Sequence, residues 1–245
     1  MKKWLFLSVL IIWGCEDHLE YVEVIKEVEV EVECECVCDS FPIEGLIAWY
    51  PFNGNSLDES GNENHPIEDT SILSQDRHGV EDKSVYFSGI KNTNFIKVDI
   101  NTESISIYTI SLWIYREGRG SDEPRVLEFW GDNGPGQLGF TWPNGGRPSI
   151  GNIYDNRTVG VVEFDIQSNN WHHVVYSVGD EITKLYLDGI LIEEQETLGI
   201  PSLSGKVAFG MMNHPLWDAF NGKLDDIGIW GRAITQDEVT YLFEN

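Results

Sequence analysis

The stretch FNGKLDDIGIWGRAITQDEV, residues 220–239, decides the fold of this chain. Its first half mixes apolar and polar residues with the period of two that a strand with one buried face shows. Its second half opens at Thr235, with Glu238 three residues later, which is the capping-box pattern of a helix start. The stretch therefore predicts a closing strand followed by a helix of about two turns.

Two adjacent carboxylates, Asp225 and Asp226, stand inside this predicted strand. In a regular strand Asp225 shares a face with Ile227 and Ile229, so strict alternation points at least one carboxylate into the core. A buried charge is costly unless hydrogen-bond donors or a cation accompany it. The pair therefore needs a partner from elsewhere in the chain.

The candidate partner is the loop NGNSLDESGNENH, residues 53–65. First and last strands commonly pair in closed sandwiches, so we expect this loop to lie near the two carboxylates. Carboxylate, amide and backbone oxygens are the ligands that Ca²⁺ takes. The sequence thus predicts a structural Ca²⁺ site at Asp58, Asn62, Asp225 and Asp226. The alternative is that Asp225 only accepts backbone N–H bonds from the loop.

Runs rich in β-branched and aromatic residues, separated by turn residues, predict further strands. They lie at 84–89, 95–100, 108–117, 125–132, 136–143, 159–166, 170–179, 183–196 and 205–212. Asp188-Gly189 is a typical hairpin turn. No second linker divides these runs, so residues 43–245 are predicted to form one all-β domain, an antiparallel β-sandwich with one short C-terminal helix.

The domain resembles a bacterial laminin-G-like jelly roll of the concanavalin A-like lectin/glucanase superfamily. The resemblance rests on the opening strand and loop, two inner strands, the hairpin and the closing stretch. These are GLIAWYPFNGNSLDESGNENH (45–65), ISLWIY (110–115), NWHHVVYS (170–177), KLYLDGILI (184–192) and residues 220–239. The resemblance implies the jelly-roll fold. It does not choose a function, because lectins, hydrolases, lyases and adhesion modules share this architecture.

The first fifteen residues, MKKWLFLSVLIIWGC, have the charged start and short apolar run of a secretory signal peptide. The small residue before Cys15 is similar to the lipobox of bacterial lipoproteins. That resemblance predicts a lipid-modified Cys15, anchoring in the outer membrane and exposure at the cell surface. The alternative is an ordinary signal peptide that happens to contain a cysteine.

Residues 16–42 read as an acidic, Val/Glu-rich stalk, with ten acidic residues and one lysine between positions 16 and 40. Mutual repulsion of the glutamates predicts an extended spacer. Cys34, Cys36 and Cys38 share one face of an extended chain. Their odd number predicts disulfides between chains, and hence a disulfide-linked homo-oligomer.

The formal net charge of −25 argues against nucleic acid and anionic membrane surfaces as ligands. Membrane attachment is therefore expected through the N-terminal lipid alone. Glucanases of the superfamily carry E-x-D-x-E on one strand. Here Glu163 and Asp165 match, but Gln167 stands where the proton donor belongs, and an amide is no general acid.

Two loop regions combine aromatic rings with polar groups, as sugar-binding sites do. The predicted ligand-binding residues are Trp130, Trp142, Arg147, Tyr154, Asn213, His214 and Trp217. The sequence thus favours non-catalytic binding of carbohydrate or a surface glycan. The alternatives are a glycoside hydrolase or polysaccharide lyase with an unrecognised site, and a protein-interaction or structural module.

Overall fold

The structure is a computed structural model. It describes residues 4–11, 22–29, 40–117, 124–131, 134–141, 147–151, 162–197, 202–211 and 218–245. The chain divides into two compact units, Met1–Val37 and Cys38–Asn245. No helix among the described residues is long and apolar enough to cross a membrane.

The first unit contains two strands, β1 (Trp4–Ile11) and β2 (Val22–Glu29), which pair antiparallel. The Val/Glu alternation of β2 needs a partner to form a ladder, and the apolar β1 supplies one. Residues 22–29 therefore form one strand of this pair, and the division into signal peptide and spacer stalk stays a prediction.

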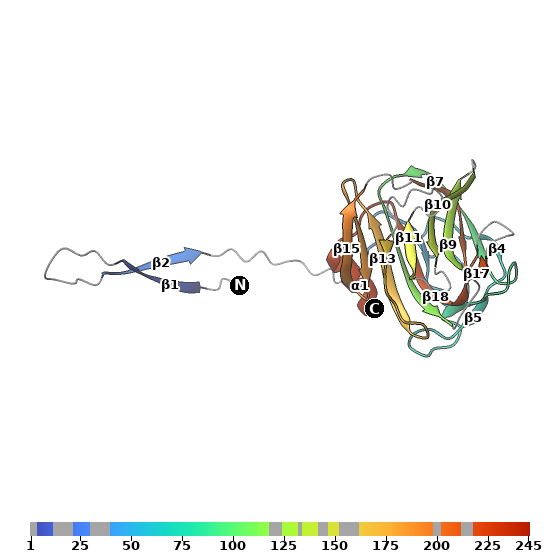
Figure 1. Cartoon of the computed structure of the whole chain (residues 1–245), viewed down its shortest axis with the longest axis horizontal. Helices are drawn as coiled ribbons and strands as arrows, with labels where there is room; N and C mark the ends of the chain where they lie inside the picture. The colour runs from blue at the N-terminus through green and yellow to red at the C-terminus, as the bar shows by residue number, and fades with distance from the viewer. Residues whose placement is uncertain are drawn as a thin grey trace. The chain divides into compact units, whose positions relative to one another are not determined.

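The second unit is a sandwich of two mainly antiparallel sheets (Figure 1). Each sheet has eight strands among the described residues. The first sheet, in spatial order, consists of β12 (Val162–Glu163), β11 (Ser149–Gly151), β10 (Gly134–Thr141), β9 (Pro124–Gly131), β16 (Leu203–Phe209), β7 (Ile96–Ile105) and β4 (Pro66–Asp69). A two-residue strand, β17 (Asp218–Ala219), pairs with β9 in parallel.

The second sheet carries the strand from which the sequence analysis began. Its order is β15 (Ile190–Glu196), β14 (Ile182–Leu187), β13 (Trp171–Val178), β8 (Tyr108–Arg116), β18 (Asn221–Trp230), β6 (Ser84–Ser88) and β5 (Ile72–Ser74). The first strand of the sandwich, β3 (Leu46–Tyr50), also pairs with β18. The predicted pairing of first and last strands is confirmed.

The core between the sheets is built from inward residues of both layers, among them Tyr50, Phe87, Leu112 and Phe209. The predicted all-β sandwich is confirmed. Of the predicted strand at 159–166, residues 159–161 lie outside the described residues, Val162–Glu163 pairs with β11, and residues 164–166 are not in a strand, so that part of the prediction is wrong. After Glu163 the chain leaves the sheet, and Phe164 turns into the core beside Phe140.

The closing helix α1 (Gln236–Glu244) begins as the sequence predicts, with Thr235 as N-cap and a complete capping box to Glu238. Its apolar side lies on the outer face of the second sheet. Val239 and Leu242 belong there to a second cluster, which also includes Val175 and Trp230.

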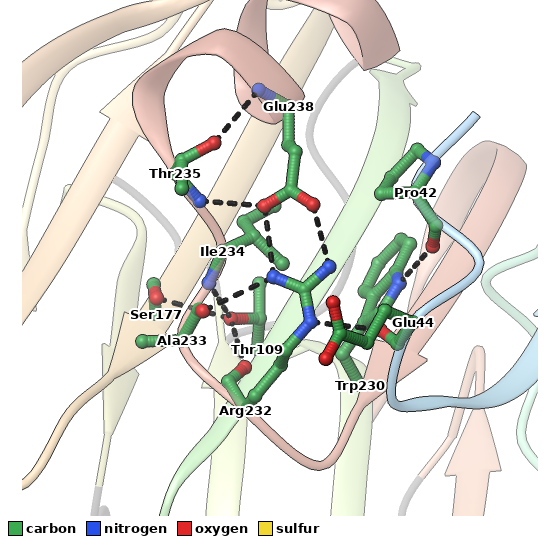
Figure 2. A network of polar contacts seen from close by, with 10 residues as sticks. All are labelled: Pro42, Glu44, Thr109, Ser177, Trp230, Arg232, Ala233, Ile234, Thr235 and Glu238. Atoms are coloured by element: carbon green, nitrogen blue, oxygen red, sulfur yellow. Dashed lines mark hydrogen bonds and ion pairs between the residues drawn. The ribbon is translucent and has the colours of Figure 1, made fainter. Parts of the chain in front are cut away.

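A polar network ties this helix to the start of the domain (Figure 2). The Arg232 guanidinium donates from Nη1 and Nη2 to both carboxylate oxygens of Glu238, at 2.8 and 2.5 Å, and from Nε to the Glu44 carbonyl at 2.7 Å. Beside it, the buried Trp230 Nε1 donates to the Pro42 carbonyl at 2.7 Å. These contacts connect segments 188 residues apart in the sequence.

We expect Arg232→Ala to lower the free energy of unfolding by about 1–3 kcal/mol, because the half-buried Glu238 carboxylate and the Glu44 carbonyl lose their donor. The matched control is Arg147→Ala. Arg147 pairs with both oxygens of Asp165 in the same way, but these two side chains are 50% and 81% exposed. We expect Arg147→Ala to lower the free energy of unfolding by less than about 1 kcal/mol. Urea denaturation measures the free energy of unfolding of both variants. Equal losses in the two would contradict the stabilising role of the Arg232 network.

Candidate ligand-binding pocket beside Arg77

A β-bulge determines where the two adjacent carboxylates point. The pairing of β18 with β8 shifts register between Asp225 and Gly228, and Asp226 has a left-handed φ of 45°. The extra residue reverses the alternation: Leu224 and Ile227, three apart, both lie in the core. The prediction that a carboxylate points into the core from a regular strand is therefore wrong. Asp225 faces outward, on the same side as Trp113 opposite it.

The bulge also marks a change of partner along one edge of β18. Residues 221–224 pair with β6, whereas residues 227–230 pair with β3. The two carboxylates lie at this junction. The loop between β5 and β6 supplies their cation, Arg77.

Arg77 Nη1 donates to Asp225 Oδ2 at 3.1 Å and to Asp226 Oδ2 at 2.7 Å. Its Nη2 donates to the Asn245 carbonyl at 3.1 Å, and its guanidinium carbon lies 4.6 Å from the centre of the Trp113 ring. The Arg77 side chain is only 9% exposed. One guanidinium thus joins a loop, two strands and the end of α1.

A tight turn holds Arg77 in place. Asp76 Oδ1 accepts hydrogen bonds from the backbone N–H groups of His78 and Val80, both at 2.8 Å, and Gly79 has a φ of 81°. Short aspartate side chains commonly stabilise turns in this way. The sequence analysis missed Arg77; its signal is the turn sequence DRHG, residues 76–79, between two predicted strands.

The electrostatics follow from two carboxylates sharing one guanidinium. Burial and, after it, the charge of Asp226 raise the pKa of Asp225 to about 8, against the lowering effect of Arg77. Burial also raises the pKa of Asp226, against the lowering effect of Arg77. The pair therefore holds a proton more readily than free aspartate does.

A pocket of about 250 Å³ opens over this clamp. Its lining residues are Pro51, Asn53, Asp76, Arg77, His78, Val80, Lys83, Asp225, Asp226 and Asn245. Among the described residues, the Asn53 amide, the His78 ring and the Lys83 ammonium form no hydrogen bond or ion pair within the chain. The pocket thus presents free donors and acceptors above a floor of buried charges, in a space somewhat smaller than most small-molecule sites.

The structure does not assemble the predicted calcium site. Asp58 accepts four hydrogen bonds, from the backbone N–H group of Trp49 in β3 and, within its own loop, from the backbone N–H groups of Ser60 and Asn64 and the Ser60 hydroxyl. Asn62 Nδ2 donates to the Leu46 and Ile47 carbonyls. Within the described part of the chain, no group of three or more His, Cys, Asp or Glu side chains is placed to hold a metal ion. Asp225 and Asp226 bind Arg77, and calcium binding stays a prediction.

Adjacent histidines His172 and His173 have separate structural roles. His173 is buried against Trp113 and Phe243, and its Nε2 lies 2.8 Å from Ser111 Oγ. Burial and the charge of Arg77 lower the pKa of His173 to about 3, so the ring stays neutral. His172 Nδ1 lies 2.9 Å from Asp188 Oδ2.

The predicted sugar-binding residues are only partly described. Trp142, Tyr154, Asn213, His214 and Trp217, like Cys15, Cys34, Cys36 and Cys38, lie outside the described residues. Trp130 is half-buried against the small apolar cluster that includes Phe95 and Met211. Arg147 is bound by the exposed Asp165. The contacts of Trp130 and Arg147 are thus with neighbouring side chains of the sandwich.

The glucanase-like run is not one strand face. β12 ends at Glu163, and Asp165 lies beyond it, paired with Arg147 at the surface. The Gln167 backbone N–H donates to His172 Nε2 at 3.3 Å. Glu163, Asp165 and Gln167 therefore do not line up as the three residues of a glucanase strand do.

The family profile described as the concanavalin A-like lectin/glucanases superfamily matches residues 91–240, which is more than half of the chain. The chain belongs to this superfamily. The matched span runs from just before β7 into α1 and includes the bulged strand. Among curated proteins, none matches the sequence.

Solved structures with this superfamily's architecture resemble the chain in shape. They include the botulinum neurotoxin serotype D ligand-binding domain in complex with N-acetylneuraminic acid, at 16% identity and a TM-score of 0.65. The Paraclostridial Mosquitocidal Protein 1 binding domain matches at 18% and 0.63. The botulinum neurotoxin DC binding domain, in complex with rat synaptotagmin II, matches at 14% and 0.64.

These matches cover 82% of this chain and 51%, 52% and 52% of the other three, so the chain spans about half the length of the structures it resembles. At these identities the likeness establishes the fold.

The raised pKa of Asp225 predicts a pH dependence of stability. In the unfolded chain the group titrates near 3.8, and in the folded chain near 8. The folded state binds the proton more tightly, so the free energy of unfolding should fall as pH rises from about 4 to about 8, by at most about 1.4 kcal/mol per pH unit from this group. Asp225→Asn should remove this part of the slope.

Urea denaturation of wild type and Asp225→Asn across that pH range measures the difference between the two proteins. Asp188→Asn is the control, because the pKa of Asp188 is shifted in the opposite direction, downward. Burial raises the pKa of Asp188, but its hydrogen bonds to His172 and to the His173 backbone lower it overall. Wild type and Asp225→Asn with the same slope would contradict the assigned protonation.

Proposed function

We propose that this chain is a lipid-anchored, surface-exposed protein whose sandwich recognises carbohydrate without catalysis. The anchor and the surface location rest on the signal sequence and Cys15. The stalk, with cross-links through Cys34, Cys36 and Cys38, would hold copies of the domain away from the membrane. One observation carries the binding function: the pocket beside Arg77, with its free polar side chains.

The chemistry of the pocket suits a polyol. A sugar hydroxyl both donates and accepts hydrogen bonds, so it needs donors and acceptors together. Lys83, His78 and Asn53 offer donors, while Asp76 Oδ2 and the Asn53 carbonyl offer acceptors. The Arg77 clamp fixes the floor, so little ordering entropy is lost on binding. The complex of a structural neighbour with N-acetylneuraminic acid agrees with a sugar ligand on this fold.

Hydrolysis fits the same groups less well. Retaining and inverting glycosidases place two carboxyl groups on opposite sides of the scissile bond. Asp225 and Asp226 both bind one nitrogen atom, Arg77 Nη1, and so are directed at the same cation. A hydrolase or lyase would have to use other groups of the chain.

Protein recognition is a second candidate, favoured by the edge of the second sheet. Edge strand β15 exposes Ile190, Leu191 and Ile192, and a free strand edge can pair with an extended peptide. A structural neighbour was solved with a protein, rat synaptotagmin II. Pull-down with Ile192→Lys as the variant separates this candidate from the first.

For the pocket, we expect Lys83→Ala to weaken binding to a glycan array at least about tenfold, because a hydrogen bond to a charged donor is lost. Lys184→Ala, on β14 next to the edge strand β15 and beside Glu194, is the matched control and should bind as wild type does. Repeating the array with a chelator tests the calcium prediction. Undiminished binding by Lys83→Ala would contradict the assignment of the pocket.

A further inference from the structure

Four side chains form a row across the outer face of the second sheet. Lys223 of β18 lies opposite Tyr86 of β6 on one side and opposite Tyr115 of β8 on the other. Tyr115 in turn lies opposite Trp171 of β13. Directly opposite residues of neighbouring strands share one face, so the four side chains point the same way.

The row begins where the cover of the C-terminal helix ends. Trp113 and His173 lie on the same face, two residues along β8 and β13 from Tyr115 and Trp171. Phe243 of α1 stacks on both of these rings. Trp113 is therefore buried. Tyr86, Tyr115 and Trp171 beyond it are only half-buried.

The rings lie close enough to act as one surface. The centres of the Tyr115 and Trp171 rings are 5.6 Å apart, and Lys223 Nζ lies 5.5 Å from the centre of the Tyr115 ring. From Tyr86 to Trp171 the row crosses three strand spacings, about 14 Å. That length accommodates more than one sugar ring. Aromatic faces stack on the apolar C–H faces of pyranose rings.

The row adjoins the pocket. Lys223 Nζ donates to the Gln75 carbonyl at 3.4 Å, and Gln75 directly precedes Asp76 and Arg77 of the pocket. On β18, Lys223 is two residues from Asp225 and on the same face. The pocket thus adjoins the row beside Lys223, between Tyr86 and Tyr115.

We propose that the row of Tyr86, Lys223, Tyr115 and Trp171 is an extended subsite beside the pocket, on which a neutral polysaccharide chain stacks. The inference rests on the proposed function and adds the class of ligand. The net charge of −25 disfavours a polyanion. Lys223 forms one long hydrogen bond and has donors left for hydroxyl groups.

The test is native affinity electrophoresis of the full-length chain in gels that contain arabinoxylan, mixed-linkage β-glucan or galactomannan, with alginate as the anionic comparison. The high net charge drives migration, so binding is read as retardation. Tyr115→Ala and Trp171→Ala should each weaken binding to the retarding neutral polysaccharide by about threefold to tenfold. Tyr115→Phe and Trp171→Phe keep a ring and should retain most of the binding.

The matched control is Tyr241→Ala, which removes a half-buried tyrosine of α1 outside the row. Melting temperatures confirm that each variant is folded. If wild type is retarded and the row variants are retarded equally, or if Tyr241→Ala weakens binding as much, the row is not a subsite, and the proposed function stands. Retardation by alginate alone would also overturn the inference.

If no neutral polysaccharide retards wild type, the subsite is overturned, and the glycan array decides the proposed function separately. Binding of short glycans that Lys83→Ala abolishes would leave the pocket assignment intact. If wild type binds neither the polysaccharides in the gels nor the glycan array, the carbohydrate proposal is contradicted altogether.

Discussion

The second sheet depends on one constraint, which is that two adjacent carboxylates must share one buried guanidinium. Asp225 and Asp226 lie where β18 exchanges β6 for β3 as its neighbour, so the ladder is weakest there. Arg77 closes that junction and stacks on Trp113. Removing the guanidinium would leave two buried carboxylates facing each other, a loss of about 3–5 kcal/mol by analogy with broken buried pairs.

The same clamp creates the surface on which ligand binding is proposed. Arg77 binds the Asn245 carbonyl, and Phe243 nearby stacks on Trp113, so the end of α1 is fixed on the sheet. One part of the outer face is thereby covered, and the rest remains open as the aromatic row. The pocket lies between them, with its floor formed by the clamp. Stability and recognition thus depend on the same contacts.

The sequence predicts the sandwich and the capping box from local periodicity and spacing. It predicts the pairing of first and last strands from the usual topology of closed sandwiches. It fails at Asp225 because alternation assumes a regular strand, and one extra residue reverses it. The extra residue is indicated by the three-residue spacing of two core residues, Leu224 and Ile227, in the sequence LDDI. Arg77 is 148 residues away in the chain, and no local pattern connects it to Asp225.

The aromatic row escapes sequence analysis for a related reason. Trp171 belongs to the stretch NWHHVVYS, which resembles an inner strand of the family, and only the register of four strands shows that it shares a face with Tyr115 and Tyr86. How far α1 extends over that face decides which aromatic rings remain open. Strand register and the position of α1 on the sheet are tertiary properties, so local sequence patterns do not reveal them. The predicted platforms at Trp142 and Trp217 lie outside the described residues and stay predictions.

The most direct measurement of the central claim is a double-mutant cycle of Arg77→Met and Asp226→Asn, followed by urea denaturation at pH 7. Methionine keeps much of the apolar stem, and asparagine tolerates the left-handed φ of position 226. The clamp predicts a coupling energy above about 1.5 kcal/mol, with the double variant more stable than the sum of the single losses allows. Losses that add to within about 0.5 kcal/mol would show that Arg77 and Asp226 act independently, which contradicts the account.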